Sequence, residues 1–392
     1  MSYPSPTAPQ PGPLPTAAKP VPLPTATKPV LFVTGHAPAD RIGAFAALHE
    51  REQVEFALFG GRSKHGGEAV GGELPFPHRH VRQQELGKLA SSGNYRAVIC
   101  STGGRVALPA TWAGTRRARV PLILWSSLWA HPRSLAHAFS FLALRRLYRS
   151  ANAVVTYGPH VSAYVRARGA RNVHVAPQSV DNDFWSSPEI TQPTQSSWPV
   201  EADCIFLFAG RPAREKGLEV LIRAWRASGL GAPTAALVLV GVGSGPPWIP
   251  AGGAVKAGES VVCFEPVGAA ELRNFYGAAD VLVVPSIPTP TFREPWGLVV
   301  NEAMNQHLPV IASDAVGAAA GGLVRDQHNG LVVPAQDSNA LAAAFRRMAS
   351  NPALRGRLGE AGAHDVRAFS HDAWAAGFSG ALQSLGVSRG RW

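Results

Sequence analysis

Two glutamates with a defined separation stand out in the segment REPWGLVVNEAMNQHLPVIAS, residues 293–313. Glu294 and Glu302 have seven residues between them, and almost every other residue of the segment is apolar or small. Pro295 and Gly297 disfavour a helix, so Glu294 belongs to a loop and Glu302 to the helix that follows. A fully helical path would separate the two carboxylates by about 12 Å, which is too far for a shared proton.

Carboxylates at this separation suit different parts of one extended ligand. The helix N-terminus between them offers free N–H groups to a phosphate, and the carboxylates can accept hydrogen bonds from sugar hydroxyls. The segment therefore indicates a site for a nucleotide sugar. The alternative, in which Glu294 is a helix-start acid and Glu302 an exposed helix acid, explains each residue but not their apolar surroundings.

A second group of candidate residues lies in FAGRPAREKGLEVLIRAW, residues 208–225. Arg211 follows an expected strand, and Lys216 lies near the first turn of the next helix. Gly210 and Gly217 allow tight backbone turns beside them. Two cations at a helix N-terminus could hold a diphosphate. Solvated surface charges remain an equally weighted interpretation.

These residues must be positioned by strands and helices, whose pattern recurs along the chain. Short, nearly continuous apolar runs are typical of parallel strands covered on both faces. Helix-length segments between them give the rhythm of βαβ units. The expected strands are 30–34, 54–60, 97–101, 120–125, 153–157, 172–177, 204–210, 235–241, 261–265, 280–286, 309–313 and 330–334. The expected helices are 40–50, 134–150, 215–227, 269–279, 298–307 and 338–350, with further helix after 352.

The pattern predicts an α/β protein of two tandem, doubly wound, Rossmann-like domains facing across a cleft. A polar, Pro- and Ser-rich segment interrupts it at residues 179–203. In such sheets the ligand binds beyond the carboxyl ends of the strands. The expected divisions are a disordered Pro-rich tail (1–29), an N-terminal domain (30–185), a linker (186–203), a C-terminal domain (204–370) and a helix packing back on the N-terminal domain (371–392).

The charge of the 392-residue chain is +11 and is unevenly placed. Residues 101–180 contain no Asp or Glu but eleven arginines. Such a block favours an anionic partner: a membrane surface, a phosphorylated substrate or nucleic acid. A compositional bias expressed on a solvated face is the open alternative.

Cysteines and apolar runs bear on the compartment. Three cysteines far apart in sequence indicate a reducing environment without a disulfide framework. The chain lacks an apolar run long enough for a transmembrane helix, and its first residues do not have the pattern of a secretory signal. We therefore expect a cytoplasmic protein.

Four segments together resemble the family-4 retaining glycosyltransferases, the group 1 glycosyl transferases with the GT-B fold. They are FAGRPAREKGLEVLIRAW, ELRNFYGAADVLVVPS, REPWGLVVNEAMNQHLPVIASD and DQHNGLVVPAQDSNALAAAF. The resemblance covers the C-terminal half almost entirely and the N-terminal half more loosely. It implies a C-terminal domain that binds a nucleotide-diphosphate sugar and an N-terminal domain that binds the acceptor.

The resemblance also implies roles for individual residues. Glu294 would contact the transferred sugar, Glu302 the ribose, and Arg211 and Lys216 the diphosphate. The other expected donor-binding residues are Gly35, Gly210, Pro266, Val267, Trp296, Gly297 and Leu298. Many members carry an active-site histidine near the end of an N-domain strand. His131 is the candidate here, although it lies six residues past Trp125, and a surface or structural role is as plausible.

The expected activity is retaining, metal-independent transfer of a hexose-type sugar to an acceptor hydroxyl, in glycolipid, cell-envelope or polysaccharide biosynthesis. No cofactor is expected, and the acceptor would be a sugar or a lipid-linked molecule. The Arg-rich stretch 101–180 suggests peripheral contact with the inner face of the cell membrane. The alternatives are a nucleotide-sugar epimerase of the same fold and a non-catalytic membrane- or nucleic-acid-binding protein. No nucleic-acid-binding module is recognisable.

Overall fold

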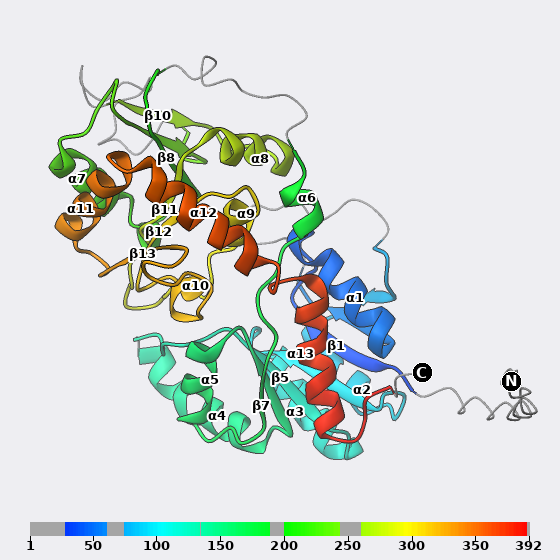
Figure 1. The fold of residues 1–392 in the computed structure, drawn as a ribbon. Coiled ribbons are helices and arrows are strands. Elements are labelled where there is room, and N and C mark those ends of the chain that lie inside the picture. Colours follow the sequence, from blue (N-terminus) through cyan, green and yellow to red (C-terminus); the bar gives the residue numbers. More distant parts are fainter. Residues whose placement is uncertain (1–27, 61–73, 134, 189–199, 244–259, 390–392) are drawn as a thin grey trace, which may run out of the picture.

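The computed structural model describes residues 28–60, 74–133, 135–188, 200–243 and 260–389, with the side chains of 135–140 left out. Within these ranges the chain forms two α/β domains, each built on one parallel sheet (Figure 1). The expected tail lies almost wholly outside the described residues.

The sheet of the N-terminal domain has seven strands in the order β3-β2-β1-β4-β5-β6-β7. Its strands are β1 (Val30–Thr34), β2 (Val54–Leu58), β3 (His78–His80), β4 (Ala97–Ser101), β5 (Leu122–Ser126), β6 (Ala153–Thr156) and β7 (Val173–Val175). The chain runs outward from β1 to β3 and then from β4 to β7. The strand order therefore reverses between β1 and β4, and loops on the two sides of that point diverge.

The sheet of the C-terminal domain has six strands in the order β10-β9-β8-β11-β12-β13. They are β8 (Ile205–Ala209), β9 (Ala236–Val240), β10 (Val261–Phe264), β11 (Val281–Val284), β12 (Val310–Ser313) and β13 (Gly330–Val333). The order reverses here between β8 and β11. Both sheets are thus doubly wound, as the sequence predicts.

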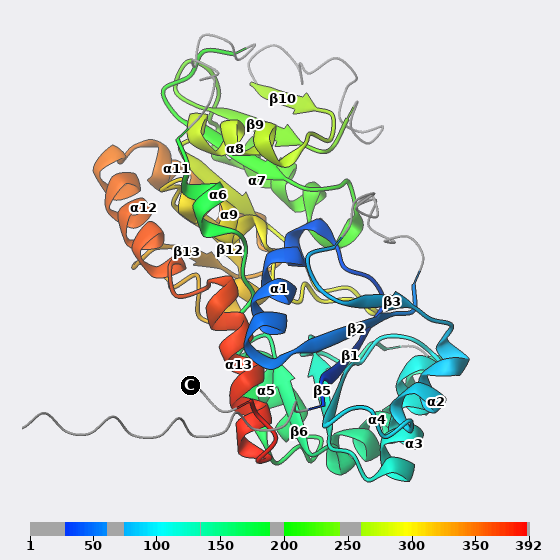
Figure 2. The ribbon, with the colours of Figure 1, turned by 90° about the vertical axis from the view of Figure 1, so that its right-hand side faces the viewer.

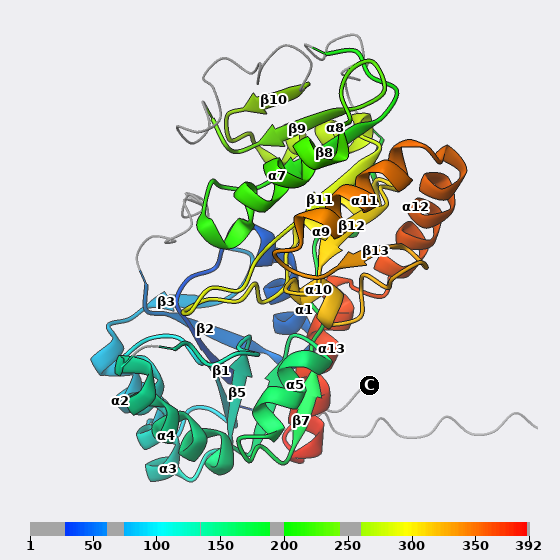
Figure 3. The ribbon, with the colours of Figure 1, turned by 90° about the vertical axis from the view of Figure 1, so that its left-hand side faces the viewer.

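Helices cover both faces of each sheet (Figure 3). The α-helices are α1 (Ile42–Glu52), α2 (Leu86–Ala90), α3 (Ala107–Ala118), α4 (Leu135–Ser150), α5 (Pro159–Arg166), α6 (Asn182–Ser186), α7 (Leu218–Ser228), α8 (Ala269–Ala278), α9 (Val299–Asn305), α10 (Gly317–Ala320), α11 (Ser338–Ala349), α12 (Pro352–Val366) and α13 (His371–Ser384). Short 3-10 helices are η1 (Ala39–Arg41), η2 (Gln83–Glu85) and η4 (Arg214–Lys216).

Strand β1 illustrates why the apolar runs are continuous. All five of its residues are buried, and neighbouring side chains point to opposite faces of the sheet. Phe32 packs in a core with α1 and α13, whereas Leu31 packs in a core with α2, α3 and α5. A strand covered on both faces has no solvent side, so its polar alternation disappears.

Every expected strand and helix is present, with ends that differ by a few residues. Strand β3 was not predicted, because its sequence HRH is short, polar and fully exposed. Helix α6 lies inside the segment interpreted as an irregular break. The Asp181 side chain begins it by accepting a hydrogen bond from the Phe184 N–H at 3.0 Å.

The C-terminal helices return the chain to the first domain. Helix α12 lies on the C-terminal domain, and α13 lies beside α1 of the N-terminal domain (Figure 2). Helix α13 also contacts β7. Trp374 and Phe378 of α13 are fully buried; Trp374 stacks on Phe32 of β1, and the Phe378 ring packs against Phe32 at a tilt. The core of the N-terminal domain therefore includes the last helix of the chain.

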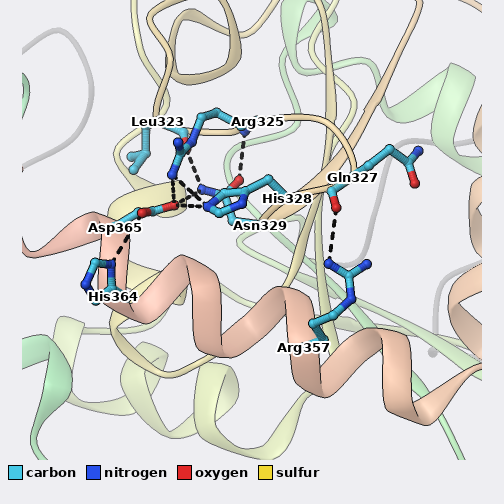
Figure 4. A network of polar contacts seen from close by, with 8 residues as sticks. All are labelled: Leu323, Arg325, Gln327, His328, Asn329, Arg357, His364 and Asp365. Atoms are coloured by element: carbon cyan, nitrogen blue, oxygen red, sulfur yellow. Dashed lines mark hydrogen bonds and ion pairs between the residues drawn. The ribbon is translucent and has the colours of Figure 1, made fainter.

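Asp365, near the end of α12, fastens this helix to the loop before β13 (Figure 4). Its carboxylate accepts hydrogen bonds from Arg325 and from the buried Asn329, the latter at 2.8 Å, and His328 lies at 2.9 Å. Asn329 also donates to the Leu323 carbonyl at 2.8 Å. The network fixes the point from which the chain crosses between the domains.

Candidate active site

The two halves of the candidate site follow the two strands at which the order of the C-terminal sheet reverses. The loop after β8 carries Arg211 and Lys216, and the loop after β11 carries Glu294. Because β8 and β11 are parallel neighbours, both loops leave from the same edge of the sheet. Lys216 Nζ donates to Glu294 Oε2 at 2.6 Å, which joins the loops directly.

Glycines allow these loops to approach so closely. Gly217 has a φ of +71°, a conformation that L side chains rarely adopt, and a Cβ there would lie 2.1 Å from the Pro285 carbonyl oxygen. Gly297 has a φ of +93° in the turn between Glu294 and α9. A side chain at Gly217 would separate Lys216 from the loop that carries Glu294.

The carboxylate of Glu294 is buried, with 8% of the residue exposed. A buried carboxylate requires a cation or hydrogen-bond donors, and Lys216 fills this role. Arg211 is exposed and pairs instead with Glu215, four residues along. Of the two expected diphosphate ligands, Lys216 is therefore held against Glu294, and Arg211 is held in the solvent-exposed part of the same loop.

Glu302 lies in the first turn of α9 and is partly buried. Desolvation raises its pKa to about 7, and the carboxylate of Asp40 adds to the rise. The Tyr276 hydroxyl donates to Glu302 Oε2 at 2.8 Å, and this hydrogen bond lowers the pKa of Glu302 in part. The alternative of an exposed surface acid is wrong, because Glu302 is partly buried and accepts the hydrogen bond from the buried Tyr276.

The residues between the two glutamates are held from inside the protein. Trp296 is buried, and its indole N–H donates to Asn301 Oδ1 at 2.7 Å. Asn301 in turn donates to the Gln178 carbonyl at 3.0 Å. Leu298 is the N-cap residue, directly before α9. The backbone from Trp296 to Leu298 therefore forms the loop-to-helix junction that the sequence predicts.

The remaining expected donor contacts follow strand ends as well. Gly210 directly follows β8 and donates to the Val240 carbonyl, and Pro266 and Val267 follow β10. Gly35 follows β1 in the other domain. It lines a wide, open pocket of about 890 Å³ at the carboxyl ends of β1, β2 and β4, where the order of the N-terminal sheet reverses.

His131 lies in a smaller pocket, of about 170 Å³, between the domains. Residues 127–132 form one wall, and residues 289–293 with Pro295 form the other. His131 Nδ1 is within hydrogen-bonding distance of the Tyr164 hydroxyl, at 3.2 Å, and the ring meets Phe141 edge-on. The structure thus brings His131 beside the loop of Glu294, and its catalytic role stays a prediction.

Two residues that the sequence did not single out hold the Glu294 loop from the N-terminal domain. Trp129 donates its indole N–H to the Glu294 carbonyl at 3.1 Å. His160 Nε2 lies 3.2 Å from the Pro295 carbonyl, which acts as the acceptor. Burial lowers the pKa of His160, so the neutral ring with its proton on Nε2 suits this contact. Nothing local in the sequence marks either residue, because both contacts span the two domains.

Two further properties concern metals and membranes. Among the described residues, no three His, Cys, Asp or Glu side chains cluster as metal ligands. No helix within the same residues has the length and hydropathy required to cross a membrane.

Comparisons with known proteins agree with this geometry. Residues 203–351 match the family model described as "Glycosyl transferases group 1". A D-inositol 3-phosphate glycosyltransferase from Streptomyces coelicolor is 41% identical over 114 residues, covering 28% of this chain and 23% of that protein. Its counterpart from Xylanimonas cellulosilytica is 32% identical over 234 residues, covering 54% and 52%. The chain thus spans about a quarter to a half of these curated relatives.

Solved structures are similar over nearly the whole chain. HepE from Anabaena in complex with UDP has a TM-score of 0.70 at 19% identity, covering 91% of this chain and all of that one, 100%. Sucrose-phosphate synthase from Thermosynechococcus elongatus has a TM-score of 0.66 at 21% identity, covering 92% and 99%. The two facing α/β domains define a protein with the GT-B fold. The match to the group 1 glycosyl transferases lies within the C-terminal domain.

Proposed function

We propose that the protein is a retaining glycosyltransferase that moves a hexose-type sugar from a nucleotide-diphosphate sugar to an acceptor hydroxyl. The observation that carries the proposal is the Lys216–Glu294 pair at 2.6 Å, with Glu302 at the start of the next helix. A cation and two carboxylates at the carboxyl ends of neighbouring parallel strands suit one ligand with a diphosphate between two polyols.

In the proposed reaction, the bond between C1 of the sugar and the diphosphate oxygen breaks. Negative charge develops on the leaving group, where Lys216 and Arg211 stabilise it electrostatically. The acceptor oxygen bonds to C1 on the same face, and its proton passes to a departing phosphate oxygen. The products are the glycosylated acceptor and the nucleoside diphosphate. Protein cations carry the charge stabilisation in this scheme, so no metal is required.

Glu294 and Glu302 hold the substrate and are not the acid and base of a hydrolase. Glu294 would accept hydrogen bonds from the sugar hydroxyls and Glu302 from the ribose hydroxyls. Binding energy from both ends of the donor positions the reacting carbon, which lowers the entropic cost of the reaction. Uridine nucleotides are the first donors to test, since HepE was solved with UDP and with UDP-glucose.

A thermal-shift screen across UDP-, GDP-, ADP- and dTDP-sugars tests the donor site. We expect one nucleotide to raise the Tm, and Glu302→Ala to weaken that effect. Glu360→Ala is a matched control, because Glu360 is an exposed helix glutamate in the same domain. The absence of stabilisation by any nucleotide sugar would overturn the proposal. Conversion of the donor without any acceptor would instead favour an epimerase.

The acceptor side of the proposal includes an anionic membrane surface. Helix α4 exposes Leu142, with 69% of its surface accessible. Helix α3 adjoins it, since Trp112 donates to Ser150 at 2.9 Å. The exposed basic residues of the two helices are Arg116, Arg117, Arg145, Arg146 and Arg149. A face of this composition suits anionic headgroups next to an apolar layer.

Co-sedimentation with vesicles tests the membrane contact. We expect binding to vesicles with phosphatidylglycerol and weaker binding to purely zwitterionic vesicles. Arg145→Glu with Arg146→Glu should reduce the binding, whereas Arg226→Glu in the other domain should change it little. If the protein stays in the supernatant with both vesicle types, it binds neither, and the membrane contact is excluded from the proposal.

A further inference from the structure

The pocket of about 170 Å³ between the domains contains an arginine, Arg293, that forms no ion pair within 4 Å among the described residues. Its walls come from the loop after β5 and from the loop that carries Glu294. The residues that line it are Ser127, Leu128, Trp129, Ala130, His131, Pro132, Thr289, Pro290, Thr291, Phe292, Arg293 and Pro295. Arg293 and His131 are the groups in this lining that can carry positive charge, and no lining residue is acidic.

Arg293 is held in place by an aromatic ring. Its guanidinium carbon lies 3.7 Å from the centre of the Trp129 ring, within the range of a cation–π contact. Its Nε is buried and makes no hydrogen bond within the described structure. One terminal nitrogen reaches the Asp314 carbonyl at 3.5 Å, the limit for a hydrogen bond. The stacking fixes the plane of the guanidinium, and the long contact with Asp314 is the one hydrogen bond that its terminal nitrogens make within the described residues.

The charge of Arg293 is only weakly balanced. Burial lowers its pKa, and the nearby Asp314 carboxylate offsets this in part. The Asp314 carboxylate accepts its own hydrogen bond from the Ala335 N–H at 2.9 Å. An arginine side chain stays protonated even when partly buried. A permanent cation therefore faces a small pocket whose walls contain proline and aromatic residues.

The acid-free stretch of the sequence accounts for one wall of this pocket. Residues 127–132 fall within residues 101–180, which contain no Asp or Glu. The opposite wall lies next to Glu294, yet Glu294 does not line the pocket, because its side chain points to Lys216. Arg293 and Pro295 therefore face the pocket while the residue between them faces the donor site.

We propose that this pocket binds the anionic group of the acceptor, a phosphate or a carboxylate, through Arg293 held against Trp129. The inference rests on the proposed glycosyltransferase function and adds the chemical class of the acceptor. The planar guanidinium matches the oxygen pairs of phosphate and carboxylate. The volume accommodates one such group with a small substituent, not a second nucleotide sugar. An acceptor bound to Arg293 would lie close to the proposed donor site, because Arg293 directly precedes Glu294 in the same loop.

The experiment is a calorimetric titration of inorganic phosphate and of glycerol 3-phosphate into the full chain, already saturated with the nucleotide found in the screen. Saturation keeps phosphate out of the Lys216 site. We expect Arg293→Gln to weaken phosphate binding by about tenfold or more, as for a charged hydrogen bond, and Arg293→Lys to weaken it less. Nucleotide affinity should stay within about twofold.

Two further variants separate binding from folding and from a rival site. Ala130→Phe fills the pocket without removing a polar group, and we expect it to abolish phosphate binding with nucleotide binding intact. Arg82→Gln alters the larger pocket of the N-terminal domain and should leave phosphate affinity unchanged. Unchanged phosphate affinity in Arg293→Gln, or a loss in Arg82→Gln alone, would overturn the inference.

The same titrations distinguish a free phosphate from a lipid headgroup. An Arg293-dependent response to glycerol 3-phosphate identifies a soluble anion, and one seen only with phosphatidylglycerol vesicles identifies a headgroup. Either response supports the pocket as an anion site. If no nucleotide sugar binds the wild-type chain, the proposed function fails; if nucleotide binds but no Arg293-dependent anion does, only this inference fails.

Discussion

The indole N–H of Trp129 donates to the backbone carbonyl of Glu294 at 3.1 Å, and the two residues belong to different domains. The Glu294 carboxylate meanwhile bonds to Lys216 within the C-terminal domain. One residue of the proposed donor site is therefore held by both domains at once. The packing of the two domains and the position of the Glu294 backbone are therefore linked through this contact.

Trp129→Phe removes the donor N–H and keeps an aromatic ring beside Arg293. We expect kcat to fall about tenfold, the equivalent of one hydrogen bond, with little change in nucleotide affinity. Trp112→Phe is the matched control, since Trp112 donates to Ser150 within the N-terminal domain. Equal turnover for the two variants would show that the contact between domains does not position Glu294.

A double-mutant cycle over Lys216 and Glu294 measures their interaction. Each single variant, Lys216→Met or Glu294→Gln, leaves the charge of the other residue unpaired in a largely buried position. The double variant removes both charges, so we expect a coupling free energy of about 1–3 kcal/mol in urea unfolding. All three variants should lose most of the transferase activity. Strictly additive unfolding free energies would contradict the pair as a stabilising contact.

The pH dependence of donor binding should report on Glu302. Its pKa is raised to about 7, first by desolvation and then by Asp40. Ribose hydroxyls donate to the ionised carboxylate, so donor affinity should rise by about tenfold between pH 6 and pH 8. Glu302→Gln should show a weaker and flat profile, and Asp40→Asn should shift the midpoint to lower pH. A wild-type profile that is flat over this range would contradict the prediction.

The same group affects the stability of the fold with a defined sign. Because the folded pKa lies above the ordinary value of 4.5, the folded protein keeps a proton that the unfolded chain loses between these two values. The stabilisation of the folded state by this proton is complete below about pH 4.5 and is lost as the pH rises to about 7. We expect the wild type to lose at most about 3 kcal/mol over this window relative to Glu302→Gln, measured by urea unfolding at each pH.

Local pattern was sufficient for the buried strands, but not for the exposed strand β3, and it was sufficient for the loop that carries Glu294. Buried parallel strands produce apolar runs, and Pro295 with Gly297 marks the start of α9. The contacts of Trp129 and His160 were beyond prediction because they join segments more than 130 residues apart in the sequence. Their geometry depends on how two domains pack. The pairing of Arg211 with Glu215 was missed for another reason: both the ligand role and the solvated role fit the same local pattern.

Gly217→Ala tests the close approach of the loops after β8 and β11. The new methyl group would lie 2.1 Å from the Pro285 carbonyl oxygen, in addition to the strain of a positive φ. We expect a loss of about 2–4 kcal/mol in stability and a loss of activity as Lys216 moves from Glu294. Gly229→Ala has a similar φ of +69° in open space, so it isolates the strain alone. If Gly217→Ala proved as stable and as active as Gly229→Ala, the close approach of the two loops would be contradicted.

Asp365→Asn tests the network that fastens α12 to the loop before β13 (Figure 4). Burial raises the pKa of Asp365, but hydrogen bonds from Arg325 and Asn329 outweigh this, so its pKa is lowered overall. The charged form is thus the one that the fold stabilises. Removing the charge should cost about 1–3 kcal/mol, seen as a lower Tm above pH 5. The difference from wild type should shrink as pH falls below the ordinary value of 3.8, where the wild-type carboxylate also gains a proton.

Glu360→Gln, on the same helix but exposed, should change the Tm little. A difference between Asp365→Asn and wild type that persists unchanged in acid would assign the effect to shape and not to charge.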